Sequence, residues 1–77
     1  MSPTYASLLK LVAAYLGAEK AAGVLERQLK TMNFSSATFT QANLKELLNT
    51  VLGATMLYVA DATKKDELRA KLTQMAA

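Results

Sequence analysis

Residues 39–60, FTQANLKELLNTVLGATMLYVA, decide the fold of this chain. The segment opens with helix-start signals, because Thr40 is suited to cap a helix and Phe39 and Leu44 have the spacing of a hydrophobic staple. Apolar residues then recur at helical spacing, and from Val51 onward a second apolar face joins the first. A helix that is apolar on all sides must be covered by its own chain or by a partner. We therefore expect this helix to be central in a small bundle that associates.

Two helical patterns precede this segment. Ser2 is suited to cap the first, which continues at helical spacing to Leu16. Gly17 is a natural stop, although one longer helix with a weak point at Gly17 is the alternative. Residues 18–32 carry the second pattern, and Gly23 within it lowers helix propensity. We interpret this glycine as the site of a close helix crossing.

A loop and a last helix complete the prediction. Residues 33–37 are loop-like, and Phe34 among them is expected to fold back onto the core. The helical pattern breaks after residue 60, where either Asp61 or Thr63 can cap a fourth helix of about residues 64–75. The predicted fold is all-α, a small four-helix bundle with a central hydrophobic third helix.

Length and composition limit the classes of function. The 77 residues make one domain, 1–77, and 52% of them are hydrophobic, which is enough for a modest core. The chain contains neither cysteine nor histidine, so the common metal ligands are missing and packing must supply the stability. Its acids form no obvious pair, and no Gly-rich phosphate loop or nucleophile motif is present. We expect no catalytic site, no cofactor and no metal site.

The hydropathy pattern indicates a soluble protein. The longest apolar stretches without charge, residues 11–18 and 51–60, are too short to span a bilayer. The first residues do not have the basic start and apolar run of a secretory signal. We expect a cytoplasmic location.

Several aromatic, methionine and aliphatic side chains exceed what one layer of four short helices needs to bury. Such residues are enriched at the centres of interfaces, although they can also complete an internal core. We expect a non-catalytic protein–protein interaction or dimerisation module, such as one in bacterial regulation or signalling, whose partner is a second copy or another protein. The candidate interface consists of Tyr5, Tyr15, Met56, Leu57, Tyr58 and Val59.

The alternative is a small nucleic-acid-binding regulator. Residues 18–32 and the start of the third helix can be read as a helix-turn-helix, although the loop between them is long and the reading helix has no arginine. The net charge of +3 is mild, and the cations are spread along the chain rather than clustered. The nucleic-acid face would consist of Gln41, Asn43, Lys45, Lys64, Lys65 and Arg69.

Overall fold

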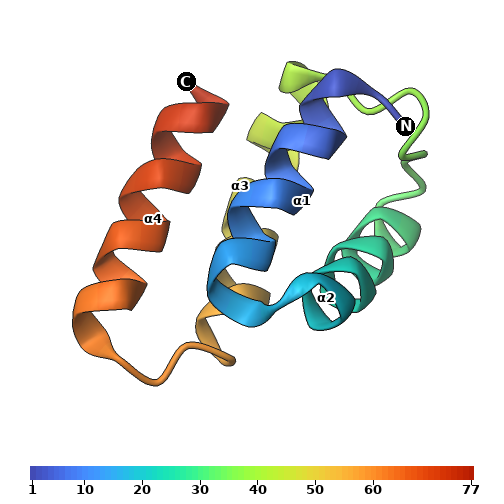
Figure 1. Ribbon diagram of the computed structural model, residues 1–77. Helices are drawn as coiled ribbons and strands as arrows, with labels where there is room; N and C mark the ends of the chain where they lie inside the picture. Colours follow the sequence, from blue (N-terminus) through green and yellow to red (C-terminus); the bar gives the residue numbers. More distant parts are fainter.

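Four helices make up the structure, a computed structural model that describes residues 1–77 (Figure 1). They are α1 (Pro3–Leu16), α2 (Ala18–Thr31), α3 (Gln41–Met56) and α4 (Ala62–Ala76). The predicted all-α fold of four helices is confirmed. The third helix is shorter than the apolar segment that predicted it, and this difference shapes the candidate site described below.

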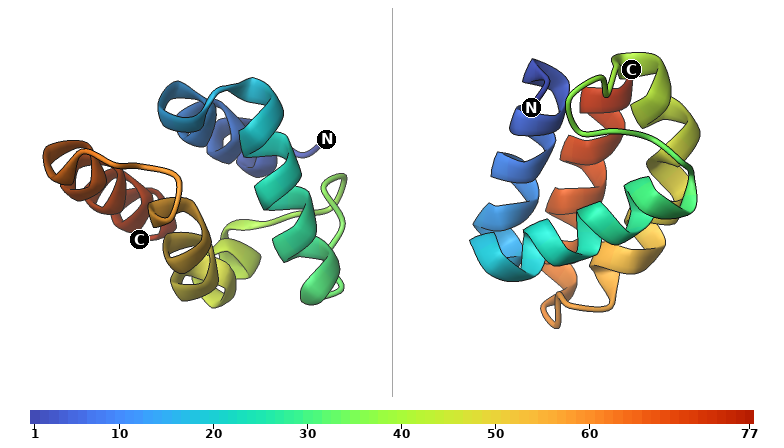
Figure 2. Two further views of the ribbon diagram at one scale, coloured as in Figure 1. Left: turned by 90° about the horizontal axis from the view of Figure 1, so that it is seen from below. Right: turned by 90° about the vertical axis from the view of Figure 1, so that its right-hand side faces the viewer.

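The helices form three layers (Figures 1 and 2). In the middle layer α1 and α3 run in the same direction, α4 runs in the opposite direction on one side, and α2 crosses on the other side. Both α1 and α3 pack against all three other helices, whereas α2 and α4 do not touch. The prediction of a central third helix is therefore not confirmed, because α1 shares that position.

A single glycine joins α1 to α2. Gly17 has φ 91° and ψ 150°, a conformation that residues with a side chain rarely adopt. Its N–H donates to the Ala13 carbonyl at 2.8 Å, and its own carbonyl accepts from the N–H of Ala21 at 2.9 Å. The same residue thus ends one helix and begins the next, and the predicted stop at Gly17 is confirmed.

A Schellman motif ends α2. Asn33 takes the left-handed conformation with φ 59°, and its N–H donates to the Lys30 carbonyl at 3.2 Å. The N–H of Phe34 donates to the Leu29 carbonyl at 2.8 Å, which completes the motif. This geometry turns Phe34 inward, and its ring lies 6.2 Å from that of Phe39. The expectation that Phe34 folds back onto the core is confirmed.

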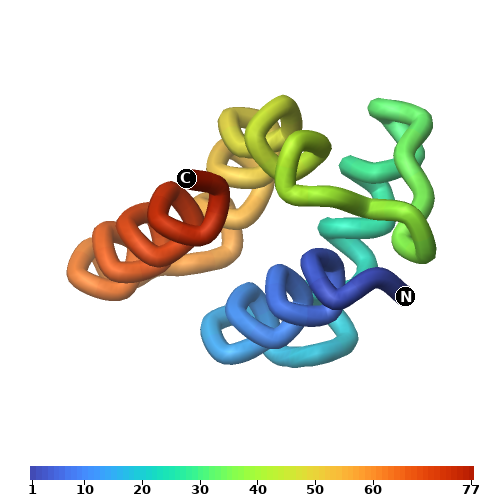
Figure 3. Tube along the Cα trace, turned by 90° about the horizontal axis from the view of Figure 1, so that it is seen from above, coloured from blue at the N-terminus to red at the C-terminus, as the bar shows by residue number.

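The connector from Met32 to Thr40 passes beside the N-terminus (Figure 3). The Ser2 N–H donates to the carbonyl of Ser36 in the connector at 2.8 Å. Phe39 is 2% exposed, and its ring meets the Tyr5 ring edge-on with centroids 6.0 Å apart. Edge-to-face pairs of this kind add to the free energy of burial. The connector is therefore anchored by its aromatic residues rather than by regular secondary structure.

The starts of α3 and α4 are fixed by side-chain caps. The Thr40 hydroxyl accepts from the Asn43 N–H at 3.2 Å, and Asn43 Oδ1 accepts from the Thr40 N–H at 3.0 Å. Phe39 and Leu44, the predicted staple residues, are both buried. At α4, Asp61 Oδ1 accepts from two backbone N–H groups of the first turn. Of the two predicted caps, the structure therefore uses Asp61.

The core fills the space that the four helices enclose. Only one face of α3 is fully buried, and the half-buried Leu48, Leu52 and Met56 pack at its edge. Thr55 is the one buried polar residue on this face, and its hydroxyl donates to the Val51 carbonyl at 2.7 Å. The core consists of Tyr5, Leu8, Val12, Ala21, Leu25, Leu29, Phe39, Leu44, Leu47, Val51, Val59, Leu68, Leu72 and Ala76.

Candidate functional site

The six residues of the predicted interface do not share one surface. Tyr5 is 2% exposed and Val59 is 6% exposed, so both belong to the core. Tyr5 packs against the Phe39 ring, and Val59 enters the core after the end of α3. Their burial removes them from any surface that this fold offers to a partner, which corrects the predicted interface.

Tyr15 contacts a different helix from the one that Tyr58 contacts. It is half-buried near the end of α1 and faces α4, where the Lys71 ammonium lies 5.5 Å from the centroid of its ring. Tyr58 instead faces α2, which α4 does not touch. Tyr15 therefore lines the contact between α1 and α4, whereas Tyr58 lines the contact with α2.

Two exposed residues, Leu57 and Tyr58, form a turn directly after Met56, the last residue of α3. The N–H of Tyr58 donates to the Thr55 carbonyl at 3.0 Å, and that of Val59 donates to the Met56 carbonyl at 3.3 Å. Val59 is buried in the core and Met56 is half-buried. Leu57, which follows Met56, points away from the core and is 83% exposed. Tyr58 is 47% exposed. We call Met56, Leu57 and Tyr58 the Leu57 turn.

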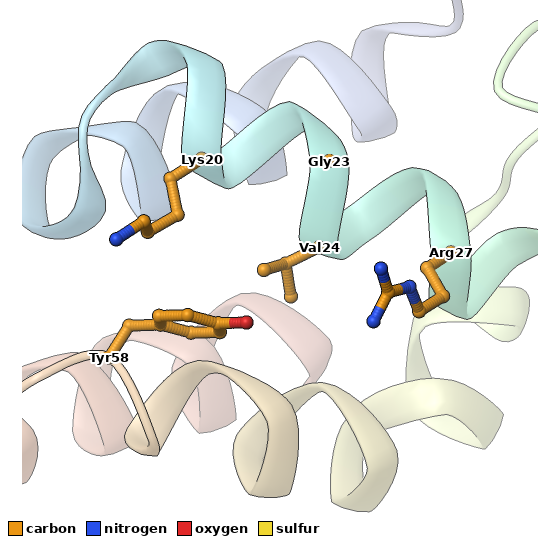
Figure 4. Close-up of a pocket in the computed structure, with 5 residues that line it drawn as sticks. All are labelled: Lys20, Gly23, Val24, Arg27 and Tyr58. Carbon is orange, nitrogen blue, oxygen red and sulfur yellow. The ribbon is translucent and has the colours of Figure 1, made fainter.

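A hollow of about 220 Å³ lies between the Leu57 turn and the outer face of α2 (Figure 4). Tyr58 forms one wall, and the other wall consists of Lys20, Gly23, Val24 and Arg27, which recur at helical spacing. In Figure 4 the side chains of Lys20 and Arg27 reach toward Tyr58 from either side of Val24. The hollow therefore combines an apolar centre with a positive charge at each end.

The two cations of the hollow have no acidic partner within the chain. The only ion pair in the structure joins Asp66 to Arg69 on α4, at 3.6 Å between exposed side chains. The Lys20 ammonium lies 5.1 Å from the centroid of the Tyr58 ring, within the range of a cation–π interaction. Such an interaction orients the ammonium without neutralising it. The hollow can therefore receive an anionic group together with apolar surface.

This hollow was not predicted from the sequence. Gly23 was expected at a close helix crossing, but no atom lies within 4 Å of the position that a Cβ would occupy there, so that expectation is wrong for the single chain. The sequence does contain a signal, because Lys20 and Arg27 lie opposite the buried stripe of α2 and Val24 lies between them and that stripe. That Tyr58 stands opposite them follows only from the tertiary fold.

The fold already uses two of the residues predicted to read bases. Gln41 Nε2 donates to the carbonyls of Met75 and Ala77, each at 2.7 Å, and so binds the start of α3 to the end of α4. Asn43 holds the N-cap of α3 through its Oδ1. Only Lys45 of this group is exposed without such a bond. This corrects the predicted reading helix, because its polar residues stabilise helix ends.

The remaining cations of the predicted nucleic-acid face lie far from this helix start. Lys64 and Lys65 are at the beginning of α4, whereas Gln41 contacts its end. At a rise of 1.5 Å per residue, the two ends of α4 are roughly 20 Å apart. Arg69 is paired with Asp66. The fold therefore does not bring the six residues together into one basic surface.

Other candidate sites carry less charge. A second hollow of about 220 Å³ lies among the starts of α1 and α3 and the end of α4, lined by Pro3, Thr4, Ser7, Gln41 and Met75. Its one amide group, that of Gln41, is bound to α4. No three acidic side chains gather where they could hold a metal ion. None of the four helices combines the length and the apolar character needed to cross a membrane.

No protein-family model, curated protein or solved structure matches this chain. The function must therefore be argued from the Leu57 turn and the hollow beside it. These two features place exposed apolar side chains next to unpaired cations.

Proposed function

We propose that this protein is a non-catalytic protein–protein interaction module that associates through the Leu57 turn and the hollow beside it. The observation that carries the proposal is the 83% exposure of Leu57. Fully burying a leucine side chain is worth about 1.5–3 kcal/mol, and Tyr58 beside it offers further apolar area. A partner that covers both side chains recovers this free energy.

The surroundings of the turn support the same proposal. Protein interfaces commonly have an apolar centre with a polar rim, and tyrosine and arginine are enriched among the residues that contribute most to binding. Leu57 and Tyr58 supply the centre here, and Lys20 and Arg27 supply charges at its edge. The partner in this proposal is a second copy or another protein.

The test is the solution mass by light scattering over a dilution series at low and at high salt. The wild type is expected to associate, and Leu57→Asp is expected to remove the association because it places a charge in the apolar centre. Leu57 has few neighbours to lose, so the variant should keep its helices by circular dichroism. The matched control is Met32→Asp, since Met32 is also an exposed apolar residue but lies after α2.

If the wild type is a monomer throughout, the test moves to other proteins. The immobilised wild type should then retain a protein from a lysate that Leu57→Asp does not retain, and that protein should bind again after purification. The proposed surface is wrong if Leu57→Asp has the same mass and retains the same proteins as the wild type.

A further inference from the structure

The outer face of α2 carries an ordered pattern of charge around one glycine. With 3.6 residues per turn, Lys20 and Arg27 lie about 40–60° to one side of Gly23, and Glu19 and Glu26 lie about 40–60° to the other side. All four charged residues are exposed, and none of them forms an ion pair within the chain. A fifth exposed charge, Lys30, lies about 20° from Gly23 and two turns further along the helix. Around Gly23 itself, the face has a cationic edge, an acidic edge and an uncovered backbone between them.

The second observation on this face is the open space beside Gly23. Glycine inside a helix lowers stability relative to alanine by about 1 kcal/mol, and nothing in the chain approaches the position of its missing Cβ. The fold of the single chain therefore gives no reason for glycine here. A second helix passing over this point would use the space, because glycine allows two helix backbones to approach closely.

We propose that a second copy of the chain packs on this face, with the two α2 helices parallel around a two-fold axis and crossing near Gly23. A two-fold axis along parallel helices places the cationic edge of one helix opposite the acidic edge of the other. Lys20 then faces the partner's Glu19, and Arg27 faces the partner's Glu26. Each facing pair is offset by about 1.5 Å along the helix axis, one residue's rise.

The four charges nearest Gly23 favour this orientation over the opposite one. In an antiparallel pair the two-fold axis is perpendicular to the helices, and each edge meets its own copy. Lys20 would then face the partner's Arg27, and Glu19 would face the partner's Glu26, so that every facing pair repels. The pattern also disfavours a nucleic acid on this face, because the acidic edge would repel its phosphates. A second copy satisfies both edges at once.

This inference rests on the proposed function, and it names the partner and the orientation. Its test reverses charges on one edge at a time and then mixes the variants. Lys20→Glu/Arg27→Glu makes both edges acidic, and Glu19→Lys/Glu26→Lys makes both basic. We expect each double variant alone to dimerise about tenfold or more weakly than the wild type by light scattering. The two mixed together should form a heterodimer with affinity close to that of the wild type.

Two matched controls separate this pairing from general effects. Lys10→Glu/Lys45→Glu changes the net charge as much as the cationic double variant does, but on exposed residues of α1 and α3, and it should dimerise like the wild type. Gly23→Gln should weaken the dimer because its side chain fills the crossing point. Ala70→Gln, at an exposed position of α4, should not. Circular dichroism checks that every variant keeps its helices.

The orientation has its own readout. A spin label on a cysteine introduced at Thr31, an exposed residue eight positions after Gly23 on α2, reports one inter-label distance per dimer. In the parallel arrangement the two labels lie at the same height along the paired helices, so the inter-label distance is short. An antiparallel arrangement would instead separate the two labels by about 24 Å along the helix axis.

Three results overturn the inference. They are a wild type that stays monomeric up to about 1 mM, reversal variants that dimerise as well as the wild type, and a mixture that forms no heterodimer.

The proposed function fails separately, because its test is the effect of Leu57→Asp on association. If Leu57→Asp removes association while the charge reversals do not, the interaction surface stands and the α2 pairing is wrong. If the reversals act as expected and Leu57→Asp has no effect, the pairing stands without the Leu57 turn.

Discussion

The two ends of α3 are built in opposite ways. At its start, polar side chains are bound within the chain, because Thr40 and Asn43 cap each other and Gln41 binds the end of α4. The apolar Phe39 there is 2% exposed. At its end, Leu57 and the neighbouring Tyr58 are exposed beside unpaired cations. We call the start of α3 the closed end, because its polar groups are bound and Phe39 is buried. We call the end of α3 the open end, because Leu57 and Tyr58 are exposed there.

This difference shows that residue type alone does not indicate which groups are free to bind. Asn43 and Gln41 look like surface groups able to read a base edge, yet both stabilise helix ends. Leu57 looks like a core residue, yet it is the most exposed of the large hydrophobic residues. The assignment depends on where each residue falls relative to the helix boundary.

The largest expected effect is at the closed end. Phe39→Ala removes a buried ring that packs against Tyr5 and Phe34, so the free energy of unfolding should fall by about 3–5 kcal/mol. Urea denaturation followed by circular dichroism measures the change. If the variant does not fold, the milder Phe39→Leu gives a measurable loss. A loss no greater than that of Leu57→Ala would show that the closed end is not the anchored one.

The cap of α3 gives the next effect. Thr40→Ala removes the hydroxyl that accepts from the Asn43 N–H, and it should lower the free energy of unfolding by about 1 kcal/mol. Thr63→Ala is the matched control, since Thr63 is exposed in the first turn of α4 but Asp61 provides that cap. Equal losses in urea denaturation would contradict a specific role for the Thr40 hydroxyl.

Tyr5→Phe should act in the opposite direction. The Tyr5 hydroxyl is buried without a hydrogen-bond partner in the chain, so its removal should raise the free energy of unfolding by about 0.5–1 kcal/mol. Burial, and then the charge of Glu26, raise the pKa of Tyr5 above its usual value. The native chain therefore keeps this proton at a pH where the unfolded chain releases it, and stability falls as the pH rises above about 10.

The pH dependence of Tyr5 is measured by urea denaturation of the wild type and Tyr5→Phe between about pH 8 and about pH 11. The difference between the two proteins isolates the contribution of the Tyr5 hydroxyl. The advantage of the variant should grow with pH over this range. A constant difference would mean that the Tyr5 pKa is the same in the folded and unfolded chain.

The smallest effect is expected at the open end. Leu57→Ala should change the free energy of unfolding of the monomer by no more than about 0.5 kcal/mol, because the side chain is 83% exposed. Urea denaturation at a concentration below that of association measures it. A loss of 2 kcal/mol or more would place Leu57 in the core and remove the contrast between the two ends.

The helix signals of the sequence were sufficient for the fold class and for most helix boundaries. Ser2, Gly17 and Thr40 act locally, through a side-chain cap or a glycine backbone, so their roles depend on neighbouring residues alone. The end of α3 was not predictable in this way. The helical period continues through Tyr58, but the helix ends at Met56 and Val59 enters the core.

The sequence by itself determined that this chain forms four capped amphipathic helices, because caps and apolar periodicity are local properties. Only the tertiary structure decided which apolar and polar residues stay free. The packing of α1 and α3 between α2 and α4 buries Tyr5, engages Gln41 and places Tyr58 opposite Lys20. These outcomes depend on contacts between residues far apart in the chain, which no local pattern specifies.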